Sequence, residues 1–262
     1  MRKYIGIILS LMLLITGCTK ESTVYSNLYD EKSQEEIKSI FSASKEIDTV
    51  LDWAKAFNQE SVGIEYKPGF VSLPKSMDYS SVYIEDMDSY ISWINCRLTT
   101  FTLLKDSIHT LENGNALDPW LMFDVEAIET VPEFSFLKPE LAHFITLFNA
   151  VSVDGLSTVD EHVQQIESAW KERKIEIDSP YSIVCVYLHS VEDSVRFVGH
   201  VGVLADTSSG LYFLEKYGNM APFQVTRLDS KEQLKTYLCS RSDFYGDPEE
   251  LDPILIENGI AI

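Results

Sequence analysis

Apolar residues in the first half of the chain recur at helical spacing. Ser33 and Glu36 have the form of a capping box, which predicts a helix from Ser33 to about Ser42. The next apolar stripe predicts a second helix over residues 46–57, whose buried face holds Ile47, Val50, Leu51, Ala54 and Phe57. The folded part of the chain is therefore expected to open with two helices.

A third apolar stripe begins at Cys96, directly after Asn95. Its members recur every three or four positions and are Leu98, Phe101, Leu104, Ile108 and Leu111. We expect one helix that ends where residues 113–137, which are acidic and rich in turn signals, begin an irregular segment. Two more helices are predicted over residues 139–151 and 158–170, the second opened by a capping box of Thr158 and Glu161.

The pattern changes to that of β-strands after residue 180. Runs rich in β-branched and aromatic residues predict strands over residues 181–189, 195–204, 211–217 and 223–228, and residues 230–239 form a last helix. Helices first and consecutive strands afterwards predict an α+β fold, in which N-terminal helices pack on a C-terminal antiparallel sheet. No internal repeat interrupts residues 33–262, which we interpret as a single globular domain.

The first residues have the features of a secretory signal. Arg2 and Lys3 precede an apolar run over residues 5–15 that is too short to span a bilayer stably. The run ends in Ile15-Thr16-Gly17-Cys18, which resembles the lipobox of bacterial lipoproteins. That resemblance implies a signal peptide over residues 1–17, a lipidated Cys18 and a polar tether over residues 18–32. The protein would then be held by its lipid anchor on the extracytoplasmic face of a bacterial cell membrane.

Composition narrows the class of partner. The 262 residues are 45% apolar and 24% charged, as in ordinary globular proteins, and the length suits about one domain. The formal net charge is −20, and it becomes −22 when the two signal cations are removed. A nucleic-acid backbone requires a basic protein surface, and a chain this acidic does not offer one. We therefore expect no nucleic-acid partner.

Cysteine and histidine usage argues against a metal site or a cofactor. After Cys18, three cysteines remain, at positions 96, 185 and 239, and an odd number leaves at least one thiol free. The sequence has no C-x-x-C pair and its five histidines are scattered, so we expect no structural zinc. Cys185 and Cys239 lie in apolar surroundings, where packing in the core is the simpler role.

Two adjacent predicted strands carry a histidine and a glutamate that could face each other. The loop over residues 206–209 is expected to join the strands with Ala205 opposite Gly210. In that register His200 lies directly opposite Glu215, and their Cβ atoms are about 4.5–5.5 Å apart on one face of the sheet. A carboxylate at this distance can hold an imidazole in one tautomer. A slip of one residue would separate the two side chains.

Cys96 occupies the first turn of its predicted helix, with Asn95 as the N-cap. Unsatisfied N–H groups and the positive end of the helix dipole favour a thiolate there, and a nearby imidazole would favour it further. A helix-start cysteine, a histidine on a later strand and a polar residue on the next strand form the papain-like layout. Considered singly, Cys96 could instead be a small core residue and His200 a satisfied sheet histidine, and His189 is an alternative base.

Short segments of the sequence also resemble a known family. Tyr25-Ser26-Asn27-Leu28, Asn95-Cys96-Arg97, Gly199 to Leu204, and Glu215-Lys216 followed by Ala221-Pro222-Phe223-Gln224 resemble a family of bacterial secreted and lipid-anchored proteins with domain of unknown function 4300. The histidine and glutamate segments are also similar to distant bacterial cell-wall cysteine hydrolases of the papain-like superfamily. This second resemblance implies a nucleophile at Cys96, a base at His200 and an orienting group at Glu215.

The chain departs from that superfamily in two respects. Papain-like peptidases often have a glutamine six residues before the nucleophile, where this chain has Tyr90. The residue that orients the histidine is more usually asparagine, aspartate or histidine in that superfamily, whereas here it is Glu215. The Cys96 backbone N–H is one oxyanion donor, and Asn95, Tyr90 and Gln224 are the candidates for another.

The leading hypothesis is a thiol hydrolase that acts on a peptide or protein substrate in the cell envelope. The alternative is a non-catalytic binding lipoprotein, in which the tyrosine-rich residues 79–90 and Trp120 line a ligand groove. A third possibility is an inhibitor-type partner of a basic secreted protein, whose association the acidic charge would accelerate.

Overall fold

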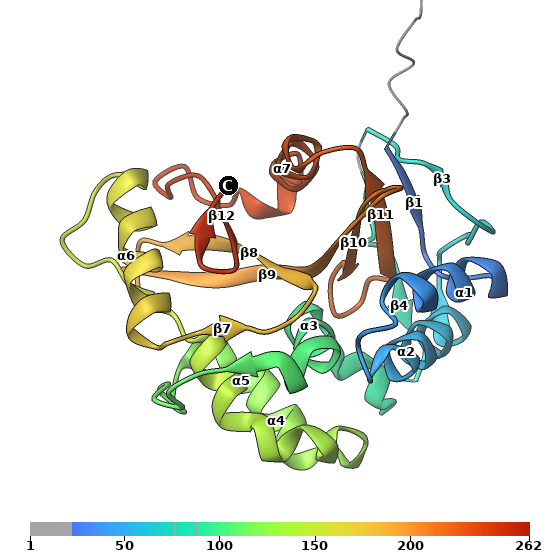
Figure 1. Ribbon diagram of the computed structural model, residues 1–262, viewed down its shortest axis with the longest axis horizontal. Helices are drawn as coiled ribbons and strands as arrows, with labels where there is room; N and C mark the ends of the chain where they lie inside the picture. The colour runs from blue at the N-terminus through green and yellow to red at the C-terminus, as the bar shows by residue number, and fades with distance from the viewer. Residues whose placement is uncertain (1–22, 76, 87) are drawn as a thin grey trace, which may run out of the picture.

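The computed structural model describes residues 23–75, 77–86 and 88–262. Its centre is a nine-stranded sheet with strand order β13-β12-β8-β9-β10-β11-β1-β3, and β6 pairs with β9 beside that path (Figure 1). The strands of this sheet are β1 (Val24–Ser26), β3 (Val71–Ser72), β6 (Val151–Ser152), β8 (Tyr181–Ser190), β9 (Val195–Thr207), β10 (Gly210–Lys216), β11 (Phe223–Leu228), β12 (Ile254–Glu257) and β13 (Ile260–Ala261). Two small antiparallel pairs lie apart from it, β2 (Ser61–Val62) with β4 (Tyr83–Ile84), and β5 (Ile108–His109) with β7 (Glu176–Ile177).

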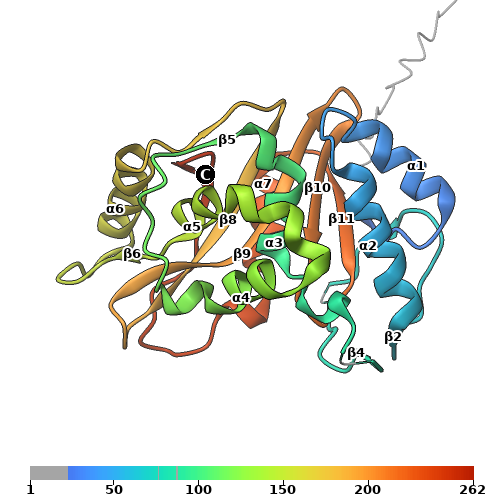
Figure 2. The same cartoon turned by 90° about the horizontal axis from the view of Figure 1, so that it is seen from below.

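Helices cover both faces of the sheet. They are α1 (Glu31–Ile40), α2 (Ile47–Glu60), α3 (Cys96–Leu104), α4 (Met122–Thr130), α5 (Leu141–Phe148), α6 (Val159–Glu172) and α7 (Lys231–Cys239). Helix α7 lies over one face, and α3, α4 and α5 lie over the other (Figures 1 and 2). The predicted α+β class is confirmed. In the part of the chain that the structure describes, no helix is both long and apolar enough to cross a bilayer.

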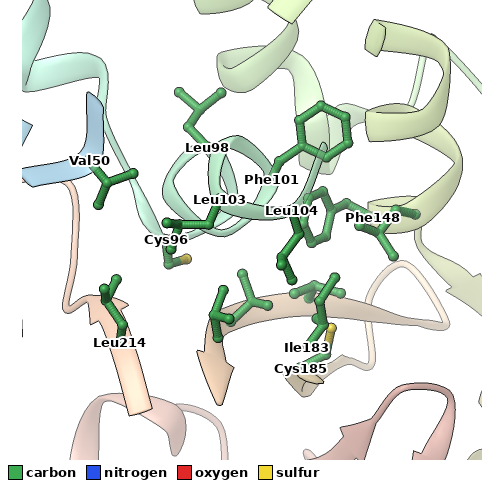
Figure 3. Packing of buried hydrophobic residues seen from close by; sticks show 14 of the residues in the cluster. Val50, Cys96, Leu98, Phe101, Leu103, Leu104, Phe148, Ile183, Cys185 and Leu214 are labelled. Carbon is green, nitrogen blue, oxygen red and sulfur yellow. The ribbon is translucent and has the colours of Figure 1, made fainter. Parts of the chain in front are cut away.

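The two faces of the sheet bury separate hydrophobic clusters. The larger cluster surrounds α3, whose Leu104 points toward the strands while Leu98 and Phe101 point away from them (Figure 3). The smaller cluster lies under α7 and joins Leu234 and Leu238 to strand residues such as Phe213. Alternation along β10 divides its residues between the two clusters, because successive side chains of a strand point to opposite faces.

Several predicted elements are present with nearly the expected bounds. Helix α2 buries all five residues of its apolar stripe, and α6 begins with the complete capping box of Thr158 and Glu161. Strands β8, β10 and β11 start and end within a residue of the prediction. Each of these segments combines a long apolar pattern with a clear start or stop signal, which explains the agreement.

Strand β1 and the start of helix α1 lie within residues 18–32, which the sequence predicted to be a polar tether. Residues 24–26 form β1, which pairs with both β11 and β3, and Leu28 is fully buried. Helix α1 starts at Glu31, and its N-cap is Asp30, whose carboxylate accepts a hydrogen bond from the Ser33 N–H. Three strand residues are too few to show a period, so the prediction missed them. The predicted signal peptide and Cys18 lie outside the described residues.

Helix α3 is shorter than predicted and the next segment is more regular. The helix ends at Leu104, and after one 3-10 turn the chain enters β5, where Ile108 pairs with Ile177. Pairing with a partner remote in sequence therefore replaced the last helical turns. Residues 113–137 were predicted to be irregular, yet they contain α4, which follows directly on the turn at Pro119.

The hairpin of β9 and β10 has a different register from the prediction. Gly210 pairs with Thr207, so the loop has two residues instead of four, and Gly202 lies opposite Glu215. His200 lies two positions before Gly202 in β9. A shift of two residues preserves the face of every side chain, so His200 and Glu215 still share one face as diagonal neighbours.

Gly199 and Gly202 make room for the side chains of neighbouring strands. A Cβ atom at Gly199 would lie 2.3 Å from Cδ1 of Leu188, and one at Gly202 would lie 2.4 Å from Cζ of Phe213. Gly199 has no partner on β8, because Val186 pairs with His200 and Tyr187 pairs with Val198. It is therefore the extra residue of a β-bulge, a device that redirects the following side chain.

We expect Gly202→Ala to lower the free energy of unfolding by roughly 1–3 kcal/mol, the usual cost of overpacking. The new methyl group would meet the Phe213 ring and also the Leu214 carbonyl oxygen at 2.7 Å, a backbone atom that cannot move freely. Urea denaturation measures the change. Gly246→Ala is the control, because its nearest contact would be a Glu250 oxygen at 3.8 Å. Equal stability of the two variants would contradict the expectation.

Candidate active site

Cys96 is the first residue of α3 and lies at the edge of the larger hydrophobic cluster. Asn95 is the N-cap in extended conformation, and its Oδ1 accepts a hydrogen bond of 3.0 Å from the Leu98 N–H. The side chain is buried, and Figure 3 shows it at the start of the helix beside the strands. The thiol therefore sits at the positive end of a helix.

His200 and Glu215 form a short, buried hydrogen bond. Nε2 of His200 lies 2.5 Å from Oε2 of Glu215, and both side chains are nearly inaccessible to solvent. This contact occupies Nε2, and it leaves Nδ1 as the ring nitrogen available to another group. The carboxylate thus fixes the orientation of the imidazole.

The Cys96 thiol and the His200 imidazole interact with each other. Burial raises the pKa of the Cys96 thiol, but the hydrogen bond to His200 and the charges of His200 and Arg97 lower it by more, so the net direction is downward. Burial and the charge of Arg241 lower the pKa of His200, while its hydrogen bonds to Cys96 and Glu215 raise it by more. Both shifts favour a thiolate beside an imidazolium.

Two residues of the C-terminal region hold Glu215 from the other side. The Tyr237 hydroxyl of α7 donates a hydrogen bond of 2.5 Å to Oε1 of Glu215. Arg241, just after α7, donates from Nη1 to Oε2 at 3.3 Å, and the same nitrogen is 3.3 Å from Nε2 of His200. Arg241 is itself fixed by Asp243 and stacks 3.7 Å above the Tyr217 ring. The guanidinium therefore shields the His200–Glu215 pair.

The three residues that the sequence offered as a second oxyanion donor lie in different environments. Asn95 lines the cleft beside Cys96, but its amide Nδ2 donates to Asp124 at 2.6 Å. Gln224 is fully buried and donates to Thr226 and to Tyr237, so its amide hydrogens are committed to the core. Tyr90 packs against Phe134 and does not line the cleft. The structure brings none of them to Cys96 as a free donor, which leaves the Cys96 N–H at the helix start as the remaining candidate.

Cys96 and His200 open into a cleft of about 360 Å³. Its wall combines aromatic and charged side chains and includes Arg97, Phe123, Tyr217, Arg241 and Phe244. A second cavity of about 640 Å³ lies next to the cleft, and Tyr217 and Asn219 form part of the wall of both. Tyr79 lines that second cavity, whereas Trp120 stacks on Phe197 at 3.7 Å and lines neither one.

The other thiols and the alternative base lie elsewhere. Cys96, Cys185 and Cys239 are all free, and Figure 3 shows Cys185 within the core below α3. His189 accepts a hydrogen bond from the Leu251 N–H and packs against His162, away from the cleft. His200 is therefore the histidine that the fold brings to Cys96.

Lys216 fixes the loop that forms one wall of the cleft. Its Nζ donates to the carbonyl oxygens of Gly218 at 2.9 Å, of Asn219 at 3.1 Å and of Ala221. The ammonium also lies 3.7 Å from the centre of the Phe57 ring, and burial lowers its pKa well below the usual range. Glu215 and Lys216 thus serve the same site from opposite faces of β10.

Sequence reasoning identified Cys96, His200 and Glu215 but not the residues that surround them. Tyr237 and Arg241 lie 22 and 26 positions after Glu215, with no motif to connect them. Asp124, which contacts Asn95, lies in the segment that was predicted to be irregular. Arg97 and Lys216 did carry a signal, because each lies next to a candidate residue in a segment that resembles a known family.

Comparison with known proteins identifies the family but no activity. A search of curated proteins and a search of solved structures found no significant match. A family model described as domain of unknown function (DUF4300) matches residues 24–262, which begin at β1 and include every element of the sheet and its covering helices. The chain therefore belongs to the DUF4300 family.

Proposed function

We propose that this protein is a lipid-anchored, extracytoplasmic cysteine hydrolase of papain-like layout that cleaves an amide or peptide bond in the cell envelope. Cys96 is the nucleophile, His200 is the general base and acid, and Glu215 orients His200. The observation that carries the proposal is the coupled arrangement in which Glu215 holds Nε2 of His200 at 2.5 Å while the imidazole lowers the pKa of the Cys96 thiol.

The reaction follows the chemistry of an activated thiolate. The Cys96 sulfur attacks the substrate carbonyl carbon and forms a C–S bond, and the carbonyl oxygen takes negative charge near the Cys96 N–H. The amide C–N bond breaks as the His200 imidazolium gives its proton to the leaving nitrogen. Water then attacks the thioester while His200 accepts a proton, the C–S bond breaks, and the carboxylic acid product leaves a regenerated thiolate–imidazolium pair.

The shape of the site favours a substrate longer than a single amide. The cleft at Cys96 continues past Tyr217 and Asn219 into the second cavity, so groups on one side of the scissile bond have a place to bind. Aromatic side chains on the wall suit apolar parts of a peptide.

A thiol-reactive probe tests the nucleophile. We expect iodoacetamide to label Cys96 in the folded protein with an apparent pKa below about 8.5, the ordinary value of a thiol. Cys239 serves as an internal reference, because burial raises its pKa. Site-resolved mass spectrometry across pH 4–10 separates the two. Labelling of Cys96 with a midpoint at or above that of Cys239 would contradict the proposed function.

The anchor is tested separately. We expect Cys18→Ala to move the protein from the membrane fraction to the soluble fraction, because the lipobox-like segment then lacks the thiol that receives the lipid. Cys239→Ala is the control and should leave the protein in the membrane fraction. An unchanged distribution of the Cys18 variant would contradict the lipid anchor without affecting the assignment of Cys96.

A further inference from the structure

A single buried carboxylate contacts the residues on both sides of the nucleophile. Asp124 of α4 is completely buried. Its Oδ1 accepts a hydrogen bond of 2.6 Å from Nδ2 of Asn95, and its Oδ2 accepts bonds from Nε and Nη2 of Arg97 at 3.0 and 2.6 Å. Asn95 and Arg97 directly precede and follow Cys96. The start of α3 is therefore fixed to α4 on both sides of the thiol.

Arg97 extends this connection to the strand that carries the base. Its remaining guanidinium nitrogen, Nη1, donates a hydrogen bond of 2.9 Å to the carbonyl oxygen of Val198. Val198 precedes the bulge residue Gly199, and His200 follows it. One planar side chain thus joins the nucleophile helix, α4 and the bulge of β9. The fork geometry of arginine allows three such bonds to form at once.

We propose that Arg97, held by Asp124, is a positioning residue that sets the separation between the Cys96 thiol and the His200 imidazole. The inference rests on the proposed function for its catalytic meaning. Neither Arg97 nor Asp124 takes part in bond formation; they hold the start of α3 against the bulge of β9.

The charges near Cys96 distinguish positioning from a simple electrostatic effect. The titratable and charged groups that interact with the thiol are His200 on β9, Arg97 on α3, Asp124 on α4, Lys216 on β10 and Cys185 on β8. Arg97 lowers the pKa of the thiol by its charge, and Asp124 raises it. Charge alone therefore predicts that neutralising Asp124 makes Cys96 more reactive, whereas positioning predicts that it makes Cys96 less reactive.

The experiment compares Arg97→Lys and Asp124→Asn with the wild-type full-length protein. Lysine keeps the charge of residue 97 but cannot make three bonds in a fork. We expect both variants to shift the apparent pKa of Cys96 alkylation by iodoacetamide upward. We also expect labelling at pH 6 to be at least about tenfold slower, because small misplacements of reacting groups are costly. A wild-type profile for Arg97→Lys, or a downward shift for Asp124→Asn, would overturn the proposal.

Arg173→Lys is the matched control. Arg173 also donates from both terminal nitrogens to backbone carbonyls, those of Asn149 at 2.7 Å and Ala150 at 2.8 Å, and it does not line the cleft. Its replacement should cost comparable stability by thermal unfolding while leaving the alkylation profile of Cys96 unchanged. An equal shift in the Arg173 variant would assign the effect to general loosening of the fold and overturn positioning.

A second readout does not depend on the protein being a hydrolase. The pKa of His200, followed by NMR, should fall on Cys96→Ala in the wild-type background, because the hydrogen bond to Cys96 raises it. In the Arg97→Lys background the same replacement should leave the His200 pKa nearly unchanged, since the two groups are no longer held together. Equal effects of Cys96→Ala in both backgrounds would overturn the positioning role, whatever the outcome for the proposed function.

Discussion

Replacing Cys96 with alanine should abolish hydrolysis, with a loss of at least about a thousandfold in kcat/KM, the scale seen when a covalent nucleophile is removed. Without the sulfur no thioester forms, and His200 alone is not placed to attack a carbonyl carbon. The measurement is cleavage of a mixture of cell-wall peptides by the purified protein, followed by mass spectrometry. Cleavage by the Cys96→Ala variant at the wild-type rate would assign the activity to another residue or to another protein.

The matched control for this loss is Cys239→Ala. Cys239 is also free, but it lies at the end of α7 and does not line the cleft. It should keep full activity. Thermal unfolding of both variants checks that the loss of activity does not come from loss of the fold. Because Cys96 is small and lies at the edge of the core, its replacement should move the midpoint of thermal unfolding by only a few degrees.

The extent to which the sequence predicts this site depends on whether a signal is local. The N-cap at Asn95 and the start of α3 at Cys96 follow from residues within one turn of each other, and the structure has both. His200 and Glu215 lie on one hairpin, so their shared face depends only on the period of a strand. The loop length was wrong by two residues, but an even error preserves the face, so the pair still met.

Contacts between distant segments could not be predicted in this way. Arg241 reaches Glu215 across 26 positions, and its place depends on how α7 packs on the sheet. Asp124 is a buried carboxylate in the acidic segment 113–137, which was predicted to be irregular. Nothing in the local sequence distinguishes this aspartate from exposed acidic neighbours such as Glu126, because its burial depends on the positions of its partners Asn95 and Arg97. The same limit applies to β1, whose three residues gain their stability from two partner strands.

The charges around His200 lead to the second prediction of large effect, because two neighbours act on its pKa with opposite sign. Glu215 raises the pKa of His200 by a hydrogen bond and by charge, whereas Arg241 lowers it by charge. In the proposed mechanism, the active form has a protonated imidazole beside a thiolate. The upper end of the active pH range is therefore set by the pH at which His200 loses its proton.

Glu215→Gln should accordingly lower the pKa of His200 and move the alkaline limb of kcat/KM to lower pH, while Arg241→Gln should raise that pKa and move the limb to higher pH. We expect each displacement to be about one pH unit or more, the scale of the effect of a charge within bonding distance, whether of opposite or like sign. NMR titration of the His200 ring gives the pKa directly, and the pH profile of turnover gives the limb. Both replacements disturb the same buried cluster, so structural damage alone would displace both limbs in one direction. Only the electrostatic role of the two residues predicts displacements of opposite sign.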